Sequence, residues 1–599
     1  MRCRRALLAA VLAVGALALP AAATAQDVRT DNMTLLKNVP KVDAATQSDL
    51  AFQGDYAYAG TYSGLRVIDI SDPANATQVA FEPCNGGQFD VSVWGDLLFA
   101  SVDTPQTNDG CSAQNTTAST PGAWEGVRVF DISDPTDPSL ITSVATDCGS
   151  HTHTIVPDPD NDNRVFIYVS SYGLTPGSIG PNCQQYHGKI SVIRVPLNRP
   201  ERARVVAEPA VDVPVFEHTR LELGSQGLQD TSGCHDITVL APRQLAAAAC
   251  LSVGQIWDIS NVRRPKPIKT MNTPFVKAWH SAQFTWDGER VAFGDEAGGG
   301  ALGRCREQDY PKTGAVWIYE VESGRTLGQY KLPRFFGDAD HCTMHNFNFV
   351  PGVDADILVS AAYHGGTTVA DVSRPWDPEE IAFYEAQEPH ALTWSSYWHN
   401  GNVYANDIAR GFDVFEVQHP SLEGAALLDR NNPQTQEELF DVDRDDRPSR
   451  KFGTFSTLPE GEARGLRIGG FARITRGLDG TKVRAVVFGL APRTTYGAHL
   501  HDQPCSVNAG GGHYKDDPAA AAMPPNELWL SSSGDPMAGI TSNRRGVARG
   551  RGSADWIARP EAQSVVIHFI PPGGTPAGGP KIACADLRYE LGGRGRAAG

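Results

Sequence analysis

The chain has 599 residues and a formal net charge of −17, with 41% hydrophobic and 20% charged residues. A chain of this length is expected to hold two or more domains, because single hydrophobic cores stop growing well below it. The acidic balance excludes a general nucleic-acid binder, which needs a basic surface to neutralise phosphates. We attribute the acidity to solubility.

Residues 1–25 have the pattern of a secretory signal. A basic start at Arg2, Arg4 and Arg5 precedes an apolar run over residues 6–19, and residues 23–25 form an A-x-A cleavage pattern. No later apolar run approaches the roughly 18 residues that a membrane-spanning helix needs. We therefore expect a secreted, extracytoplasmic protein with no membrane span.

The cysteine content fits an oxidising compartment. Of the 11 cysteines, Cys3 lies in the signal, and an even number remains in the rest of the chain. An even number in an exported chain predicts disulfides, although spacing alone leaves most pairings open. The pairs that we favour before residue 463 are Cys234 with Cys250 and Cys305 with Cys342.

A short β-rich pattern recurs seven times along the first two thirds of the chain. The clearest copies are residues 65–73, L-R-V-I-D-I-S-D-P, and residues 127–135, V-R-V-F-D-I-S-D-P. Each copy has the alternation of a strand, most copies end in a polar turn, and a further strand pair precedes each one. The weaker copies begin at Ile190, Gln255, Val316, Thr368 and Phe412.

Three or four strands per repeat, repeated seven times, predict a seven-bladed β-propeller. The shared core, Val/Leu-x-Val/Ile-x-Asp-Ile/Val-Ser, resembles the LVIVD repeat family. The resemblance implies a propeller over residues 26–420 and no particular reaction. A propeller of this kind could bind a protein or cell-surface partner.

Four histidines recur in register with these repeats. Each falls about seven residues before the turn of the first hairpin of its blade, and the first strand of a blade lines the central channel. We call them the channel histidines: His151, His235, His280 and His345. Acidic and histidine side chains lie near them in the sequence, namely Asp236, Asp295, Glu296, His364 and Asp407. The cluster could bind a metal ion or an anionic ligand, or it could simply be the polar lining of a hydrated channel mouth.

Residues 421–462 are polar, charged and interrupted by proline, which predicts a linker. Alternating strands follow over residues 466–474 and 481–490, with Gly480 at the turn between them, as expected for a β-sandwich. The Gly/Arg/Ala-rich residues 593–599 predict a disordered tail.

Four histidines and two cysteines lie between residues 498 and 584. His499 and His501 are two apart, so both side chains face the same side of a strand. His568 ends the β-branched run of residues 565–567, and His513 follows three glycines that can fold a loop over the site. Imidazole ligands suit copper and also zinc.

This order of H-x-H, cysteine, Gly-His, strand histidine and cysteine resembles the copper/zinc superoxide dismutase family. The resemblance implies an all-β chain in which the propeller precedes a Greek-key β-sandwich over residues 463–592. It implies that His499, His501, His513 and His568 bind copper and that Cys505 and Cys584 form the structural disulfide.

The family's zinc loop has no counterpart here. No histidine lies between His513 and His568, and the first acidic side chains after His513 are Asp516, Asp517, Glu527 and Asp535. The resemblance is therefore closer to copper-only members, with one copper ion and no zinc. Asp502 or Asp517 could orient one of the rings.

Lys581 stands where the family has its substrate-guiding arginine, so the charge is kept and the planar fork is lost. His513 and Lys581 are the predicted catalytic residues, with Lys581 guiding the anion. The expected function is copper-dependent disproportionation of superoxide by a sandwich carried on a propeller. The alternatives are a non-enzymatic binding or adhesion propeller with an inactive or copper-carrying sandwich, and a metal-dependent oxidation at the channel histidines.

Overall fold

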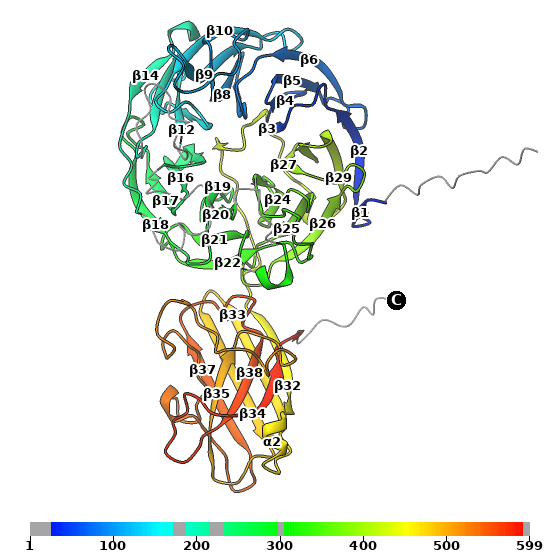
Figure 1. The fold of residues 1–599 in the computed structure, drawn as a ribbon, viewed down its shortest axis with the longest axis vertical. Coiled ribbons are helices and arrows are strands. Elements are labelled where there is room, and N and C mark those ends of the chain that lie inside the picture. The colour runs from blue at the N-terminus through cyan, green and yellow to red at the C-terminus, as the bar shows by residue number, and fades with distance from the viewer. Residues whose placement is uncertain (1–25, 172–186, 215–232, 298–304, 311, 591–599) are drawn as a thin grey trace, which may run out of the picture.

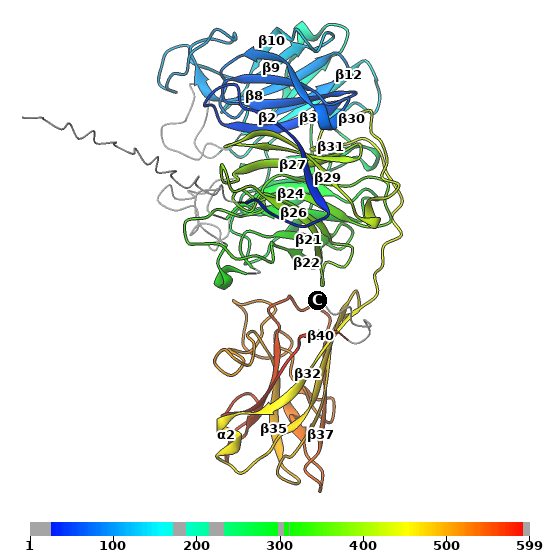
Figure 2. The ribbon, with the colours of Figure 1, turned by 90° about the vertical axis from the view of Figure 1, so that its right-hand side faces the viewer.

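The computed structural model describes residues 26–171, 187–214, 233–297, 305–310 and 312–590. The predicted signal and the predicted tail lie outside the described residues. The described chain forms a ring of sheets followed by an elongated C-terminal β-domain (Figures 1 and 2).

Seven antiparallel blades stand around a common axis in the part of the chain that the structure describes (Figure 1). Their strands, from the innermost outward, are β3 (Gln47–Gln53), β4 (Tyr56–Thr61), β5 (Gly64–Asp69) and β6 (Thr77–Pro83); β7 (Val91–Trp94), β8 (Leu97–Gln106), β9 (Trp124–Asp131) and β10 (Ser139–Ala145); β11 (Thr152–Pro157), β12 (Arg164–Ser170), β13 (Ser191–Pro196) and β14 (Arg204–Ala207); β15 (Ile237–Leu240), β16 (Leu245–Cys250), β17 (Val253–Asp258) and β18 (Lys266–Met271); β19 (Trp279–Phe284), β20 (Arg290–Asp295), β21 (Val316–Glu320) and β22 (Thr326–Tyr330); β23 (Phe347–Phe349), β24 (Ile357–Ala361), β25 (Thr367–Asp371) and β26 (Glu379–Glu385); and β27 (Thr393–His399), β28 (Asn402–Asp407), β29 (Gly411–Val417) and β2 (Met33–Pro40). The predicted seven-bladed propeller is confirmed.

The seven repeat copies form the third strand of their blades: β5, β9, β13, β17, β21, β25 and β29. These strands are largely buried on both faces because each blade packs between two neighbours. The polar end of the pattern makes a turn, since the Asp69 carboxylate accepts from the Ser71 amide at 2.9 Å. Asp131 and Ser133 repeat this contact at 2.9 Å.

The two ends of the propeller sequence share the last blade. Strand β2 pairs antiparallel with β29, from Met33 opposite Val417 to Pro40 opposite Gly411. Strand β1 (Val28–Arg29) adds to the outer edge of β26. The ring is therefore closed by backbone hydrogen bonds between segments that are distant in the sequence.

The segment after β29 is packed against the propeller. Its strand β30 (Arg430–Asn431) pairs with β3, and its strand β31 (Thr435–Gln436) pairs in parallel with β15. The Asn432 side chain bonds to both the amide and the carbonyl of Val93, at 2.7 and 2.8 Å. Thr435 Oγ1 donates to Ile155 O at 2.8 Å. These polar residues, which predicted a linker, satisfy backbone groups of the innermost strands and run across the middle of the ring (Figure 1).

The C-terminal domain is a nearly closed sheet in the order β36-β35-β38-β39-β32-β33-β34-β37. Its strands are β32 (Ser449–Thr457), β33 (Gly469–Gly477), β34 (Gly480–Phe488), β35 (Thr495–His501), β36 (Ile540–Thr541), β37 (Ala548–Ala554), β38 (Ser564–Phe569), β39 (Lys581–Asp586) and β40 (Tyr589–Glu590), with a short helix α2 (Pro459–Glu462). Short 3-10 turns elsewhere are Pro73–Asn75, Pro200–Arg202, Ala241–Arg243, Glu307–Asp309, Pro420–Leu422 and Pro536–Ala538. One apolar core fills the space between the two halves of the sheet.

The domain starts earlier than the sequence predicted. Strand β32 begins at Ser449, inside the predicted linker, and pairs with β33 on one side and β39 on the other. Its burial alternates with many polar side chains facing outward, so the strand lacks an apolar run. Lys451 Nζ also contacts Asp377 Oδ1 of the propeller at 2.6 Å, so the two domains touch.

Four disulfides are present in the described chain, and they suggest an oxidising environment. They join Cys84 with Cys111, Cys234 with Cys250, Cys305 with Cys342, and Cys505 with Cys584. The last three pairings confirm the predictions, and the first was not predicted. Among the described residues, none of the helices has the length and apolar character to cross a membrane.

Candidate metal centre

Two neighbouring strands position three of the four C-terminal histidines. Strands β35 and β38 are antiparallel, with Gly497 opposite His568 and His501 opposite Ser564. His499 and His501 share one side of β35. A Cβ atom at Gly497 would lie 3.3 Å from Cε1 of His499 and 2.4 Å from Pro576 O, so only glycine leaves room here.

The glycine run brings the fourth histidine to the same place. Gly511 adopts a φ of 69°, in the left-handed region that favours glycine. The Asp502 carboxylate accepts from the Gly512 amide at 2.8 Å. His513 then forms an antiparallel bridge with His501. Asp502 thus shapes the loop and does not orient a ring, and Asp517 accepts from the Ala519 amide at 2.8 Å.

The four histidines converge. One ring nitrogen from each of them lies within 4.8 Å of the others. Nε2 of His501 and Nε2 of His568 are 3.1 Å apart, and the ring centroids of His499 and His513 are 4.1 Å apart. Three of the rings are buried, and the His513 side chain is 19% exposed. We call this set the C-terminal histidine cluster.

Neighbouring acceptors fix two of the rings. Nδ1 of His513 lies 2.9 Å from Glu527 Oε2, and Nδ1 of His568 lies 2.9 Å from Gly579 O. A carboxylate and a carbonyl accept only, so both Nδ1 atoms carry the proton and both Nε2 lone pairs face the cluster. Among the described residues, the ring nitrogens of His499 and Nδ1 of His501 are buried without a hydrogen-bond partner.

The buried rings of the cluster are neutral, as the imidazole ligands of a metal cation must be. Burial, helped by the adjacent rings, lowers the pKa of His499 to about 2 and that of His568 to about 4. The same causes hold the pKa of His501 well below its usual value. Ligands about 2.1 Å from a tetrahedral ion lie roughly 3.4 Å apart, and the Nε2 atoms of His501 and His568 are 3.1 Å apart. The donor set therefore fits a copper or zinc ion.

Glu527 is the residue whose role sequence reasoning missed. Its carboxylate is 3% exposed and accepts from both His513 and Trp529 Nε1, the latter at 2.6 Å. Glu527 and Trp529 are two residues apart, and in an extended segment this spacing indicates that both side chains lie on the same face. Asp516 instead lies 3.5 Å from Arg559.

Lys581 is anchored beside the cluster. Its Nζ donates to Asn508 O at 2.8 Å and to Gly511 O, so the ammonium group braces the loop that carries His513. Burial lowers the pKa of Lys581. Its positive charge contributes to the lowered pKa of His501 and His568, so the field of the ammonium reaches the cluster.

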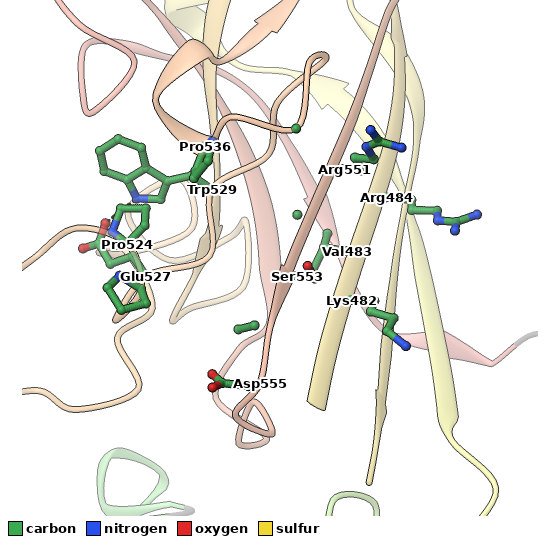
Figure 3. Close-up of a pocket in the computed structure, with 14 residues that line it drawn as sticks. Lys482, Val483, Arg484, Pro524, Glu527, Trp529, Pro536, Arg551, Ser553 and Asp555 are labelled. Atoms are coloured by element: carbon green, nitrogen blue, oxygen red, sulfur yellow. Dashed lines mark hydrogen bonds between the residues drawn. The ribbon is translucent and has the colours of Figure 1, made fainter. Parts of the chain in front are cut away.

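A surface pocket of about 630 Å³ lies behind the residues that brace His513. Figure 3 shows Glu527 and Trp529 on one wall and basic side chains from β34 and β37 on the opposite one. The basic side chains are Lys482, Arg484 and Arg551. The Lys482 and Arg484 side chains extend away from Glu527 and Trp529, and Asp555 also lines the pocket (Figure 3).

The channel histidines also lie together, at the starts of β11, β15, β19 and β23. Of the nearby acidic side chains, Asp236 lies within 4.8 Å of His235 and His280, and Glu296 lies within 4.8 Å of His280 and His345. Asp295 and Asp407 accept from backbone amides instead, at 2.9 Å in each case. His364 stacks on His390, with ring centroids 4.7 Å apart.

Comparison with known proteins agrees with the propeller. The LVIVD repeat family model matches residues 46–80 and 122–146, within the first two blades. The fold and these matches define a seven-bladed β-propeller. It is a propeller with LVIVD repeats, followed by a β-domain that carries the C-terminal histidine cluster.

No curated protein matches the chain. Among solved structures, one chain of the S. cerevisiae complex of Dbp5 with Nup159, Gle1, IP6 and ADP is similar at 11% identity and a TM-score of 0.36. The similarity covers 65% of this chain and 95% of that one.

Proposed function

We propose that the protein is an exported copper-dependent superoxide dismutase, in which the C-terminal domain is a Greek-key sandwich of the copper-only type. The observation that carries the proposal is the convergence of four imidazoles within 4.8 Å, three of them buried with strongly lowered pKa values. The stapling of the adjacent loop by the Cys505–Cys584 disulfide supports it. Residues 1–25 would direct the chain out of the cell.

His499, His501, His513 and His568 would hold the ion. A bound copper ion would supply one-electron chemistry, by which two superoxide ions and two protons give dioxygen and hydrogen peroxide. His513 is the most exposed of the four rings, so its Nε2 is the atom best placed to exchange a proton with solvent. Glu527 holds the Nδ1 proton of that ring and so keeps Nε2 directed at the cluster.

The surroundings of His513 favour copper alone over a copper and zinc pair. The side of the ring that would face a second metal is occupied by Glu527, whose carboxylate is shared with Trp529. In the described part of the chain, the groups able to hold a metal do not include a second histidine set that contains His513.

The direct test is a superoxide assay on the full chain after removal of all metals. We expect activity to appear on addition of copper and to stay absent on addition of zinc alone, because zinc has no redox chemistry. A copper-loaded chain with no activity above free copper would contradict the proposed function.

Replacing Lys581 by methionine should reduce the superoxide rate at low ionic strength by about tenfold, because the ammonium raises the local concentration of the anion. The deficit should shrink as added salt screens the field. The measurement is kcat/KM against ionic strength, with copper content determined for each variant.

Lys515→Met is the matched control, because Lys515 binds the carbonyl of Ala520 at 3.1 Å in the same domain without contact to Asn508 or Gly511. A Lys581→Met deficit that is equal at all salt concentrations, or that follows loss of copper, would show that the lysine acts only by bracing the loop.

A further inference from the structure

The channel histidines form a continuous row of rings contributed by four consecutive blades. Successive ring centroids from His151 to His235, His280 and His345 are 4.5, 3.8 and 4.3 Å apart. Each residue is at most 9% exposed. Buried polar atoms are nearly always paired, so the ring nitrogens of these imidazoles are expected to bond to a hydrogen-bond donor, a hydrogen-bond acceptor or a cation.

The first two rings meet at their Nε2 atoms. Nδ1 of His151 lies 2.8 Å from Asp103 Oδ2, and Nδ1 of His235 lies 3.0 Å from Asp236 Oδ1. Each Nδ1 atom faces a carboxylate, and the two Nε2 atoms lie 2.9 Å apart. This carboxylate–histidine arrangement is the one that orients imidazoles toward a metal ion.

The other two rings surround a carboxylate. Nδ1 of His345 bonds to Trp394 O at 2.5 Å, so its Nε2 is an acceptor, and it lies 3.6 Å from Glu296 Oε1. Nε2 of His280 lies 3.6 Å from Glu296 Oε2. Among the described residues, the buried Nδ1 of His280 has no hydrogen-bond partner. Two ligands of one tetrahedral ion are expected roughly 3.4 Å apart.

The charges around the row favour a cation over an anion. Asp103, Asp236 and Glu296 contact the rings directly.

We propose that the propeller holds a second metal ion, a divalent first-row transition metal bound by His280, His345 and Glu296, whose ligand atoms lie within 4.8 Å of one another, with His235 and His151 beside it. Imidazole with one carboxylate suits zinc, copper, iron or nickel. The ion would lie at the end of the channel opposite the segment that carries β30 and β31: His151 directly precedes β11, and Thr435 contacts Ile155 farther along that strand.

The test counts metal in full-length chains. A background variant with His501→Ala and His568→Ala removes the C-terminal histidine cluster. After exposure to zinc or cobalt and extensive dialysis, this background should retain one ion per chain by mass spectrometry of the metal. Adding His280→Ala with His345→Ala should remove that ion. The matched control, His399→Ala, should retain it, because His399 is equally buried but stacks on Phe52.

The cobalt-loaded background should show visible absorption bands of a four-coordinate ion, and Glu296→Gln should shift them, even if that variant still binds metal. Unfolding curves of the metal-free variants establish that each one is folded. A folded background chain that retains no ion, or an ion that survives His280→Ala with His345→Ala, would overturn the proposal. The metal count therefore tests the channel site separately from the proposed dismutase activity. The background variant lacks superoxide activity whether or not the channel ion is present.

Discussion

Replacing His501 by alanine should abolish copper retention by the C-terminal histidine cluster and lower superoxide activity by well over a hundredfold. Residues that only orient a ligand cost about 10–100-fold in metal affinity when removed, and His501 is itself a proposed ligand. Its Nε2 lies 3.1 Å from that of His568, so the alanine leaves three rings around an open position. Copper content and the superoxide assay on the full chain measure both effects.

The substitution is not expected to unfold the domain. His501 is 0% exposed, but its Nδ1 has no hydrogen-bond partner among the described residues, so the 3.1 Å contact of its Nε2 with His568 is the polar contact that the alanine removes. His399→Ala in the propeller is the control for removing a buried histidine. Retention of full activity by a folded His501→Ala chain would sink the proposed copper chemistry.

Replacing both Cys505 and Cys584 by serine should lower the free energy of unfolding of the C-terminal domain by about 2–5 kcal/mol. The bond joins residues 79 apart in the sequence, a long loop whose closure restricts the unfolded chain. The disulfide also fixes the start of the loop that carries His513. A hydrogen bond from the Cys505 amide to Asp586 Oδ1, at 2.6 Å, holds the same point. We therefore expect weaker copper binding as well.

Thermal and denaturant unfolding, followed separately for the two domains, measures the loss. The double serine variant of Cys84 and Cys111 is the control, because that bond spans 27 residues in the propeller. It should destabilise the propeller without changing copper binding. A C-terminal transition that is unchanged in the Cys505 and Cys584 variant would contradict the expected role of the bond.

Local sequence was sufficient for the features that depend on strand period and turn chemistry. The repeat strands and their Asp-x-Ser turns predicted the blades, because alternation and a side-chain-capped turn are properties of a few consecutive residues. The His499-x-His501 spacing placed two rings on one side of a strand for the same reason. Counting the copies then set the number of blades.

Tertiary structure alone decided which distant segments meet. The sequence of residues 430–436 predicts a free linker, yet the segment lies across the channel because its amides match backbone groups of several inner strands. Glu527 was one of six acidic residues between His513 and His568, and only the packed loop selected it as the partner of His513. The 3.6 Å distances from Glu296 to His280 and His345 could not be predicted from the sequence either. Period and turn signals act between neighbours in the chain, whereas the choice of a partner depends on the packing of the whole fold.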